Sequence, residues 1–354
     1  IRDRRQPARP EGWPTHYEAK VNPFFARIAG KDSIDEEGVI VKYAMASPET
    51  LDAQPEELER ALLALPSISI VTDKRHFFDS RTGIHVKPEG RGRKWERPVS
   101  VELIDPQGRE PGFQIDAGIR VRGGHSRSAA CQKHGYRLYF RKEYGAGELD
   151  YPLFGDEGVS RFDDIDLRTA QNYSYHYSDS SHHTLVRDVF SRDCQRDLGQ
   201  PYTRSRYYHL YLNGLYWGMY HIFERFEDDM LAEHFGGEEE DWDAIKDAGR
   251  ASVLEVVDGD LNAWNRTLAV TRRDMSNPRN YANALIFIDP DTWIDYFITN
   301  FYSGNTDWDQ SNWRAARRRE RDAKWMLFAW DSERTDLNAT QGTNSSTNDA
   351  TVEN

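Results

Sequence analysis

The sequence has little cysteine and no long apolar run among its 354 residues. Cys131 and Cys194 are the only cysteines, too few for a disulfide framework, so the redox compartment stays open. They could pair only if the fold brings them together. The absence of any run of 18 apolar residues excludes a membrane-spanning helix. Since the chain begins at Ile1 with neither Met nor an apolar signal segment, we expect a processed or excised piece.

Basic residues are outnumbered by acidic ones. The sequence holds 46 Lys and Arg against 59 Asp and Glu, which gives a formal net charge of −13. This balance argues against nucleic acid or an anionic membrane as a partner. A basic partner would be attracted, although a solvated acidic surface is the commoner origin of such a charge.

The first two thirds of the sequence predict a mainly β structure after an N-terminal arm. Residues 1–50 are rich in Pro, Arg and Gly, which favours an extended arm or linker. Residues 51–223 begin with a predicted helix at 55–65 and end in a hairpin around Asn213-Gly214. Between them we expect strands at 68–71, 85–86, 99–104, 113–122, 136–141 and 162–168. A helix at 184–198 is predicted to bury Leu185, Val189 and Cys194.

The remaining third predicts a mainly helical structure, so that the whole chain is expected to be α+β. Helical signals in residues 224–336 cover 227–235, 260–270, 279–286 and 290–303. In the last of these, Trp293, Phe297 and Phe301 recur every four residues and indicate a core face. A final strand at 324–330 places Asp331 at its end. Residues 337–354 are almost entirely polar and are predicted to be a disordered tail.

Three polar residues near the C-terminal end stand at an informative spacing. Asn312 follows Asp307 by five positions (312 − 307), and Asp331 follows it by 24 (331 − 307). Phosphoryl-transfer enzymes of the kinase type need one Asp as a proton acceptor, then an Asn and a later Asp for Mg²⁺. We therefore interpret Asp307 as a candidate base and Asn312 and Asp331 as candidate metal ligands. Asp309 and Glu333 are competing carboxylates, and Asp or Asn residues after a helix are more often caps.

Groups suited to phosphate lie nearer the N-terminus. Gly123 and Gly124 follow a predicted strand, where glycine lets backbone N–H groups approach phosphate oxygens, and Ser126 adds a hydroxyl donor. Lys133 precedes another predicted strand and could contact phosphates as a point charge. Arg137 shares its strand face if that strand extends back to Lys133. The structural alternatives are an ordinary Gly-Gly turn and a solvated lysine.

Six segments in a fixed order resemble the CotH family, which is named for a bacterial spore-coat protein and regarded as atypical, secreted-type protein kinases. The resemblance covers about residues 66–336. The segments are GIRVRGGHSR (118–127), KHGYRL (133–138), LYLNGLYWGMY (210–220), ER (224–225), NFYSGNTD (300–307) and WD (330–331). Residues 129–132 depart from the family pattern, which usually ends this stretch in Pro, and a single Lys before His134 replaces a frequent Lys pair.

The resemblance implies a two-lobed, atypical protein-kinase-like fold with a β-rich N-lobe and a mainly helical C-lobe. It implies ATP and Mg²⁺ as cofactors, ATP lying between the lobes, and Ser or Thr hydroxyls of a protein as the acceptor. Secretion or a bacterial cell surface is implied as the location. Glu224 then falls where a kinase places its adenine-contacting hinge, although Glu224 and Arg225 could equally form a structural ion pair.

Two other functions remain open at this stage. A carbohydrate-active or carbohydrate-binding surface protein would account for ten Trp and eighteen Tyr together with many carboxylates. A catalytically dead kinase relative could serve as a binding module, although all three polar residues of the candidate site are present. His176, His182 and His183 could suggest a transition-metal site, but their position before a helix favours a cap region.

Overall fold

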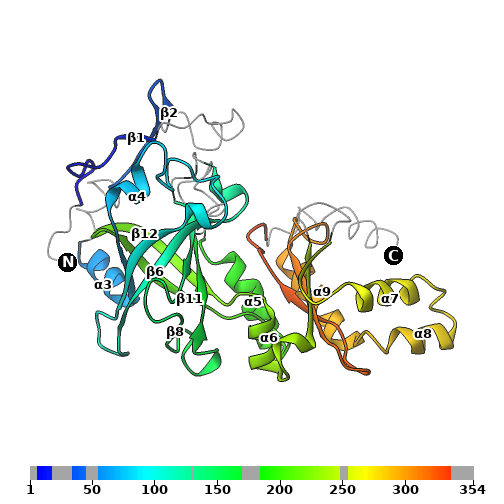
Figure 1. Cartoon of the computed structure of the whole chain (residues 1–354). Helices are drawn as coiled ribbons and strands as arrows, with labels where there is room; N and C mark the ends of the chain where they lie inside the picture. The colour runs from blue at the N-terminus through cyan, green and yellow to red at the C-terminus, as the bar shows by residue number, and fades with distance from the viewer. Residues whose placement is uncertain are drawn as a thin grey trace. The chain divides into compact units, whose positions relative to one another are not determined.

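The chain folds as an α+β protein with two compact units. The computed structural model describes residues 6–17, 34–44, 55–128, 131, 133–169, 184–247 and 254–335. The first unit consists of residues 1–183 and 205–223, and the second of residues 184–204 and 224–354. Figure 1 shows the elements of both units. The predicted tail at 337–354 and the histidines at 176–183 lie outside the described residues.

A closed barrel of seven strands forms the first unit, in the order β10-β12-β11-β4-β5-β6-β7. Neighbouring strands are antiparallel except β4 and β11, which run parallel. The barrel closes where β7 pairs with β10, with Leu138 opposite Ile165. The strands are β4 (Ser67–Val71), β5 (Arg97–Ile104), β6 (Phe113–Arg122), β7 (Gly135–Tyr139), β10 (Asp164–Thr169), β11 (Ser205–Leu212) and β12 (Leu215–Phe223). Alternate side chains point inward and build the core, as the pleat of a strand requires.

Most predicted strands of the first unit are confirmed, but the one at 85–86 is wrong. His85 and Val86 lie in a turn, where the His85 N–H donates to the Phe77 carbonyl (2.9 Å). Both side chains are buried, so a short apolar run here reflects packing and no strand. The Asn213-Gly214 hairpin is confirmed, because both residues adopt the positive φ (48° and 82°) that such a two-residue turn needs.

The N-terminal region contributes to the barrel's core. β1 (His16–Tyr17), β2 (Ile34–Asp35) and β3 (Gly38–Ile40) form a small sheet in the order β1-β3-β2. Tyr17 and Val39 are fully buried in the same cluster as the barrel side chains. The described part of the predicted arm is therefore packed structure.

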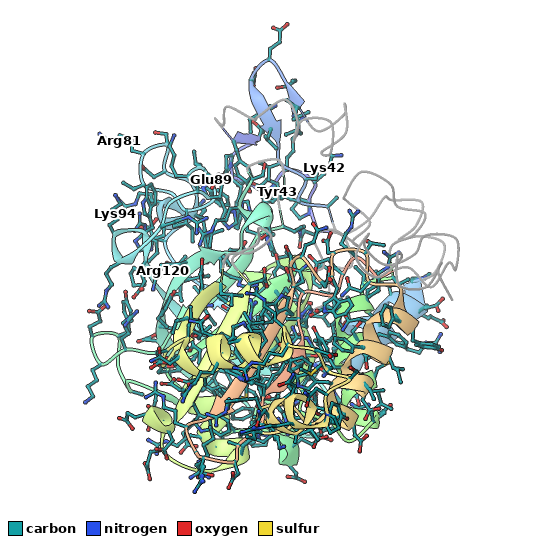
Figure 2. The ribbon with its side chains drawn as sticks, turned by 90° about the vertical axis from the view of Figure 1, so that its right-hand side faces the viewer. Lys42, Tyr43, Arg81, Glu89, Lys94 and Arg120 are labelled. Carbon is teal, nitrogen blue, oxygen red and sulfur yellow. The ribbon has the colours of Figure 1, made fainter. Side chains whose placement is uncertain are left out.

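Short elements surround the barrel strands. They are α3 (Pro55–Ala64), α4 (Lys74–Phe78), β8 (Leu149–Asp150) and β9 (Arg161–Phe162), and α3 confirms the helix predicted at 55–65. Between α4 and β5 the chain carries exposed basic side chains, of which Arg81 and Lys94 project outward in Figure 2. Arg120 on β6, labelled in the same view, instead pairs with the buried carboxylate of Glu96 (3.1 Å).

The second unit combines five helices with a four-stranded sheet among its described residues. The helices are α5 (Arg187–Asp197), α6 (Asp228–Phe235), α7 (Asn262–Thr271), α8 (Pro278–Ala284) and α9 (Pro290–Ser303). The sheet has the order β14-β13-β15-β16, with β13 (Trp242–Asp247), β14 (Leu254–Asp258), β15 (Trp313–Arg318) and β16 (Met326–Ala329). The predicted helices and the last strand are confirmed. The prediction that this unit is mainly helical is only partly right, because the sequence analysis did not predict the strands β13, β14 and β15.

Helix α5 packs through polar side chains, contrary to the predicted apolar face. Its fully buried residues are Asp188, Ser191, Arg192 and Gln195, whereas the predicted Leu185, Val189 and Cys194 are only half-buried. The Gln195 amide donates to the Leu327 carbonyl (2.9 Å) and accepts from the Ala329 N–H (2.6 Å). Gln195 thereby satisfies the edge strand β16, whose backbone groups would otherwise lack partners.

Candidate active site

The two predicted metal ligands lie at one end of the sheet in the second unit. β15 and β16 are antiparallel, with Trp313 opposite Ala329. Asn312 precedes Trp313, and Asp331 follows Ala329 by two positions, so both residues emerge from the same end of this strand pair. Both are half-buried, which leaves part of each accessible to a ligand. The fold thus brings together two residues that are 19 positions apart (331 − 312).

Both residues adopt a left-handed backbone conformation. Asn312 has φ 66° and Asp331 has φ 56°, and only two other non-glycine residues in the described ranges, Leu185 and Asn213, share a positive φ. Outside glycine this conformation is uncommon, and Asn and Asp adopt it more readily than other residues do. Such residues gather at functional sites. The pair that the spacing selected is therefore among the four non-glycine residues of the described ranges with a positive φ.

The loop that carries Asp307 is fastened to the segment after Asp331. Helix α9 ends at Gly304, whose φ of 62° caps it. Asn305 then forms a bridge with Thr335, and the Thr306 N–H donates to the Arg334 carbonyl (3.2 Å). The Asn305 side chain accepts the N–H of Asp307 itself (3.2 Å). Asp307 is half-buried beside this bridge, close in the fold to the Asp331 segment.

Trp308 anchors the Asp307 loop in the core of the second unit. It is 5% exposed, and its indole N–H donates to the Tyr296 hydroxyl (2.8 Å). Its ring also contacts Phe297 and Phe301 of α9, at centroid distances of 5.6 Å and 5.8 Å. The predicted aromatic stripe on α9 is thus core at Phe297, whereas Phe301 remains 44% exposed.

The residues present fit a magnesium ion shared with phosphates. Within the described residues no group of three or more His, Cys, Asp or Glu side chains could hold a metal. Asn312 and Asp331 supply one amide and one carboxylate oxygen, which are hard ligands. Mg²⁺ commonly takes one or two carboxylates from protein and completes its octahedron with water and substrate phosphates. Such a pair suits a metal that arrives with its nucleotide.

In the first unit, the predicted glycine loop follows β6 directly. Gly123 has φ 106°, and a Cβ at this position would collide with the Ser126 Oγ. The Arg127 guanidinium donates to the carbonyls of Gly123 (2.7 Å), Pro88 (3.0 Å) and Gly90 (3.0 Å), which makes the loop rigid. Gly124 has open space around it. Only Gly123 therefore depends on being glycine.

Lys133 lies next to His134, which is hydrogen-bonded to the loop at Gly123–Ser126. The buried His134 donates from Nδ1 to the Ser126 carbonyl (2.9 Å). The Lys133 ammonium lies 4.1 Å from the centroid of the Trp217 ring, and no carboxylate of the described residues lies within ion-pair distance. Burial lowers the pKa of Lys133 to about 7. A half-buried amine without an acidic partner is well suited to an anion supplied by a ligand.

Arg137 and Glu224 are already engaged in ion pairs. Arg137 donates to both oxygens of Asp166 (2.6 and 2.9 Å). Glu224 is 2% exposed and accepts from His234 Nε2 (2.7 Å) and from the Arg204 guanidinium (3.2 Å). The Glu224 N–H donates to the Arg204 carbonyl (2.9 Å). Glu224 therefore does form a structural ion pair, as the alternative interpretation of the sequence allowed. Its partners are Arg204 and His234, whereas the predicted partner was Arg225.

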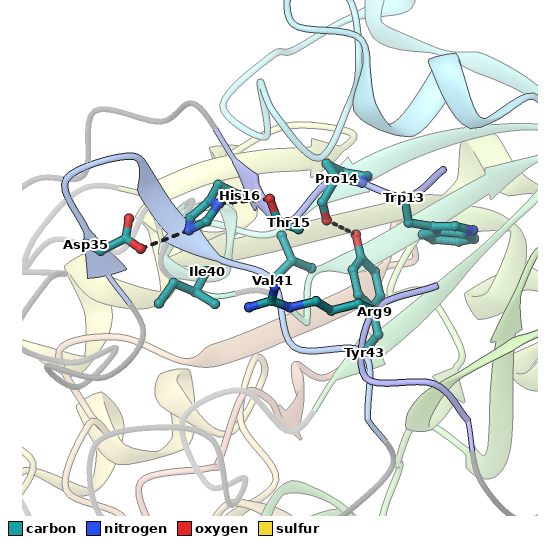
Figure 3. A pocket seen from close by; sticks show the side chains of 9 residues that line it. All are labelled: Arg9, Trp13, Pro14, Thr15, His16, Asp35, Ile40, Val41 and Tyr43. Atoms are coloured by element: carbon teal, nitrogen blue, oxygen red, sulfur yellow. Dashed lines mark hydrogen bonds and ion pairs between the residues drawn. The ribbon is translucent and has the colours of Figure 1, made fainter. Parts of the chain in front are cut away.

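A pocket of about 110 Å³ lies elsewhere in the first unit and contains none of the predicted site residues. Figure 3 shows that the His16 ring points toward the Asp35 carboxylate, to which it is bonded (2.9 Å), and that the Tyr43 hydroxyl reaches the Pro14 carbonyl. The lining residues are Arg9, Trp13, Pro14, Thr15, His16, Asp35, Ile40, Val41 and Tyr43.

The comparison with protein families confirms the resemblance noted in the sequence. A family model described as CotH kinase protein matches residues 119–354, about two thirds of the chain. The chain therefore belongs to this family. Every predicted site residue falls within the matched segment, whereas the pocket of Figure 3 lies wholly before it. A search of curated proteins found no match. None of the described helices is long and apolar enough to cross a membrane.

Proposed function

We propose that this chain is a Mg²⁺- and ATP-dependent protein kinase that transfers the γ-phosphoryl group to Ser or Thr hydroxyls. Membership of the CotH kinase protein family supports this proposal. The observation that carries it is the convergence of Asp307, Asn312 and Asp331 in the second unit, with a left-handed backbone at the last two. Phosphoryl transfer needs positioning and charge stabilisation more than covalent chemistry from the protein.

Asp307 is the proposed general base. Its carboxylate would orient the acceptor hydroxyl and take its proton as the phosphorus–oxygen bond forms. The N–H of Asp307 is bonded to the Asn305 side chain, and Trp308 is buried beside it, so the backbone that carries this carboxylate is fixed. Bound Mg²⁺ would neutralise charge on the phosphates, and Asn312 and Asp331 would hold it.

The groups of the first unit are proposed to hold phosphate oxygens. Lys133 would supply a positive charge, and the loop at Gly123 would supply backbone N–H groups and the Ser126 hydroxyl. Arg137 contributes to this role only indirectly, because its guanidinium is bonded to Asp166. Arg122 also pairs with Asp166 (3.2 Å), so the charge of these two arginines is partly neutralised inside the unit.

The tryptophan content does not favour the carbohydrate alternative. All ten tryptophans are buried or half-buried, and none belongs to the exposed class. Sugar-stacking platforms need an accessible ring face, whereas Trp217 and Trp325 are at most 1% exposed. The tryptophan content therefore reflects packing of the two cores.

Binding isotherms for ATP with Mg²⁺ and with EDTA test the proposal. A triphosphate beside Asp307 and Asp331 would otherwise face like charge, so we expect binding only with the metal. Asp331→Asn should weaken the metal-dependent part of binding, and Asp309→Asn should leave it nearly unchanged. Equal affinity in EDTA would remove the metal from the proposal. The opposite behaviour of the two variants would reassign the ligand to Asp309.

A further inference from the structure

Two carboxylates outside the predicted site, buried Asp188 and half-buried Asp247, each accept a backbone N–H at or next to one proposed metal ligand. Asp188, on α5, is fully buried, and its Oδ1 accepts the N–H of Ser332 (2.8 Å), the residue after Asp331. Asp247, at the end of β13, accepts with Oδ2 the N–H of Asn312 itself (2.9 Å). These bonds reach across 144 and 65 positions of sequence, respectively.

The contacts of Asp188 hold the chain on both sides of Asp331. Its Oδ2 accepts from Arg192 Nε (3.1 Å), one turn further along α5. The Arg192 guanidinium lies 4.8 Å from the centroid of the Trp330 ring, and it also donates to the Thr203 hydroxyl. Trp330 and Ser332 are thus both held by α5, while Asp331 between them remains half-buried. Contacts on both sides of Asp331 thus favour its left-handed φ.

Asp247 holds the backbone at Asn312 in a similar way. It lies on β13, which pairs with β15 on the side away from β16. Its Oδ2 also accepts from the Trp313 N–H (3.2 Å) and from Arg314 Nη1 (3.1 Å). The Arg314 guanidinium in turn lies 4.6 Å from the centroid of the Trp330 ring. The Trp330 ring therefore contacts both Arg192, the partner of Asp188, and Arg314, the partner of Asp247. This ring connects the two sets of contacts.

We infer that Asp188 and Asp247 are positioning residues, which hold Asp331 and Asn312 in the left-handed conformation that directs both side chains to one metal ion. The inference rests on the proposed function, because it assumes that Asn312 and Asp331 are the ligands. Asp188 with both oxygens, and Asp247 with its Oδ2, accept from backbone N–H groups and guanidinium groups, which is why we assign them a role that acts through the ligands. Second-sphere partners of this kind commonly change metal affinity by about 10- to 100-fold when removed.

Binding of Mn²⁺ in the presence of a non-hydrolysable ATP analogue, followed by electron paramagnetic resonance, tests this directly without requiring turnover. We expect Asp188→Ala and Asp247→Ala to raise the Mn²⁺ Kd by about tenfold. Asp188→Asn should fall between wild type and Asp188→Ala, because its amide oxygen can still accept the Ser332 N–H.

Asp243 provides a matched control on the same strand. It is 3% exposed and accepts from Arg319 Nε (2.8 Å) and the Asp260 N–H (3.0 Å), four positions before Asp247. Asp243→Ala should lower the melting temperature without changing the Mn²⁺ Kd. An equal rise in Kd for Asp243→Ala would overturn the inference, since general loosening would then explain the effect. If the alanine variants do not fold, Asp188→Asn is compared with Asp243→Asn under the same criterion.

Asp331→Ala separates failure of this inference from failure of the proposed function. If Asp331→Ala binds Mn²⁺ as tightly as wild type, the metal assignment itself is wrong. If Asp331→Ala loses binding while Asp188→Ala and Asp247→Ala keep the wild-type Kd, only the positioning role is refuted. Loss of binding in Asp247→Ala as complete as in Asp331→Ala would make Asp247 a ligand and overturn its positioning role.

Discussion

The Lys133 amine, which has no carboxylate partner in the part of the chain that the structure describes, predicts that ATP binding weakens as the pH rises above neutrality. Burial lowers the pKa of Lys133 to about 7 in the free protein. A bound phosphate would raise this pKa, because an adjacent negative charge favours the ammonium form. ATP binding should therefore be coupled to proton uptake, and affinity should fall as the pH rises from the pKa of the free protein to the pKa of the complex, and level off above it.

The size of the effect follows from the protonated fraction of Lys133. With a pKa of about 7, about half of the amine is charged at about pH 7 and roughly 1% at about pH 9. If only the charged form contacts phosphate, affinity falls by about 50-fold over this range, or about 2.3 kcal/mol. Calorimetry at about pH 8, in buffers of different ionisation enthalpy, should detect the uptake of nearly one proton per ATP.

Matched variants isolate Lys133 from other titrating groups. Lys133→Met keeps the length of the side chain without its charge, so ATP affinity should be low and independent of pH. Lys133→Arg stays charged, so its affinity should be independent of pH over the same range. Lys142, an exposed lysine nine positions further on, is the control, and Lys142→Met should retain the wild-type profile. A flat profile for the wild-type protein, or equal effects of the two methionine variants, would refute the reasoning.

Two further substitutions separate binding from stability. Gly123→Ala should lower ATP affinity by about tenfold or more, because the positive φ of Gly123 and the nearby Ser126 Oγ leave no room for a Cβ. Gly124 has open space around it, so Gly124→Ala should bind ATP like the wild-type protein. Isothermal titration of both variants with ATP checks this. Glu224→Gln should reduce the free energy of unfolding by about 3 kcal/mol, since it breaks a buried charge network with His234. Burial raises the pKa of Glu224, but its hydrogen bonds to His234 and the Arg204 backbone, together with the charges of both residues, outweigh burial and lower the pKa below its ordinary value of 4.5. The Glu224 contribution should therefore be full at neutral pH and be lost as the pH falls through the lowered pKa. Equal unfolding curves for wild type and Glu224→Gln at neutral pH would contradict this.

The sequence predicted those turns and helices whose conformation depends on neighbouring residues. The Asn213-Gly214 turn and helix α9 depend on neighbouring residues, and both are found where expected. Strand β15 was missed because its sequence, WRAARR, carries three arginines. Its Ala315 and Ala316 are fully buried only because β13 and β16 pair with it on either side. Tertiary pairing, which no local pattern records, decides that strand.

In the candidate site, too, some residues could be selected from the sequence and others became evident only in the folded structure. Residue type and spacing selected Asp307, Asn312 and Asp331 as candidates, because the proposed phosphoryl transfer would require both. Asp188 and Asp247 carried no signal, because their partners are backbone N–H groups that the sequence cannot associate with them. The left-handed φ of Asn312 and Asp331 could not be predicted either, because no turn signal such as Asn213-Gly214 marks these two positions in the sequence. The predicted apolar face of α5 failed for a similar reason, since buried Gln195 serves the edge of β16.

Transfer of radiolabelled γ-phosphate from ATP to a Ser-rich acceptor or to the protein itself, compared between wild type and Asp307→Asn, tests the proposed kinase function most directly. Asn keeps the size of Asp307 but cannot accept the proton, so transfer should fall by roughly 10²- to 10⁴-fold. ATP affinity with Mg²⁺ and the melting temperature should stay near the wild-type values, because Asn312 and Asp331 remain and Asn is nearly as good a turn former. Normal transfer by Asp307→Asn, or no transfer by the wild-type chain with Mg²⁺, would contradict the account.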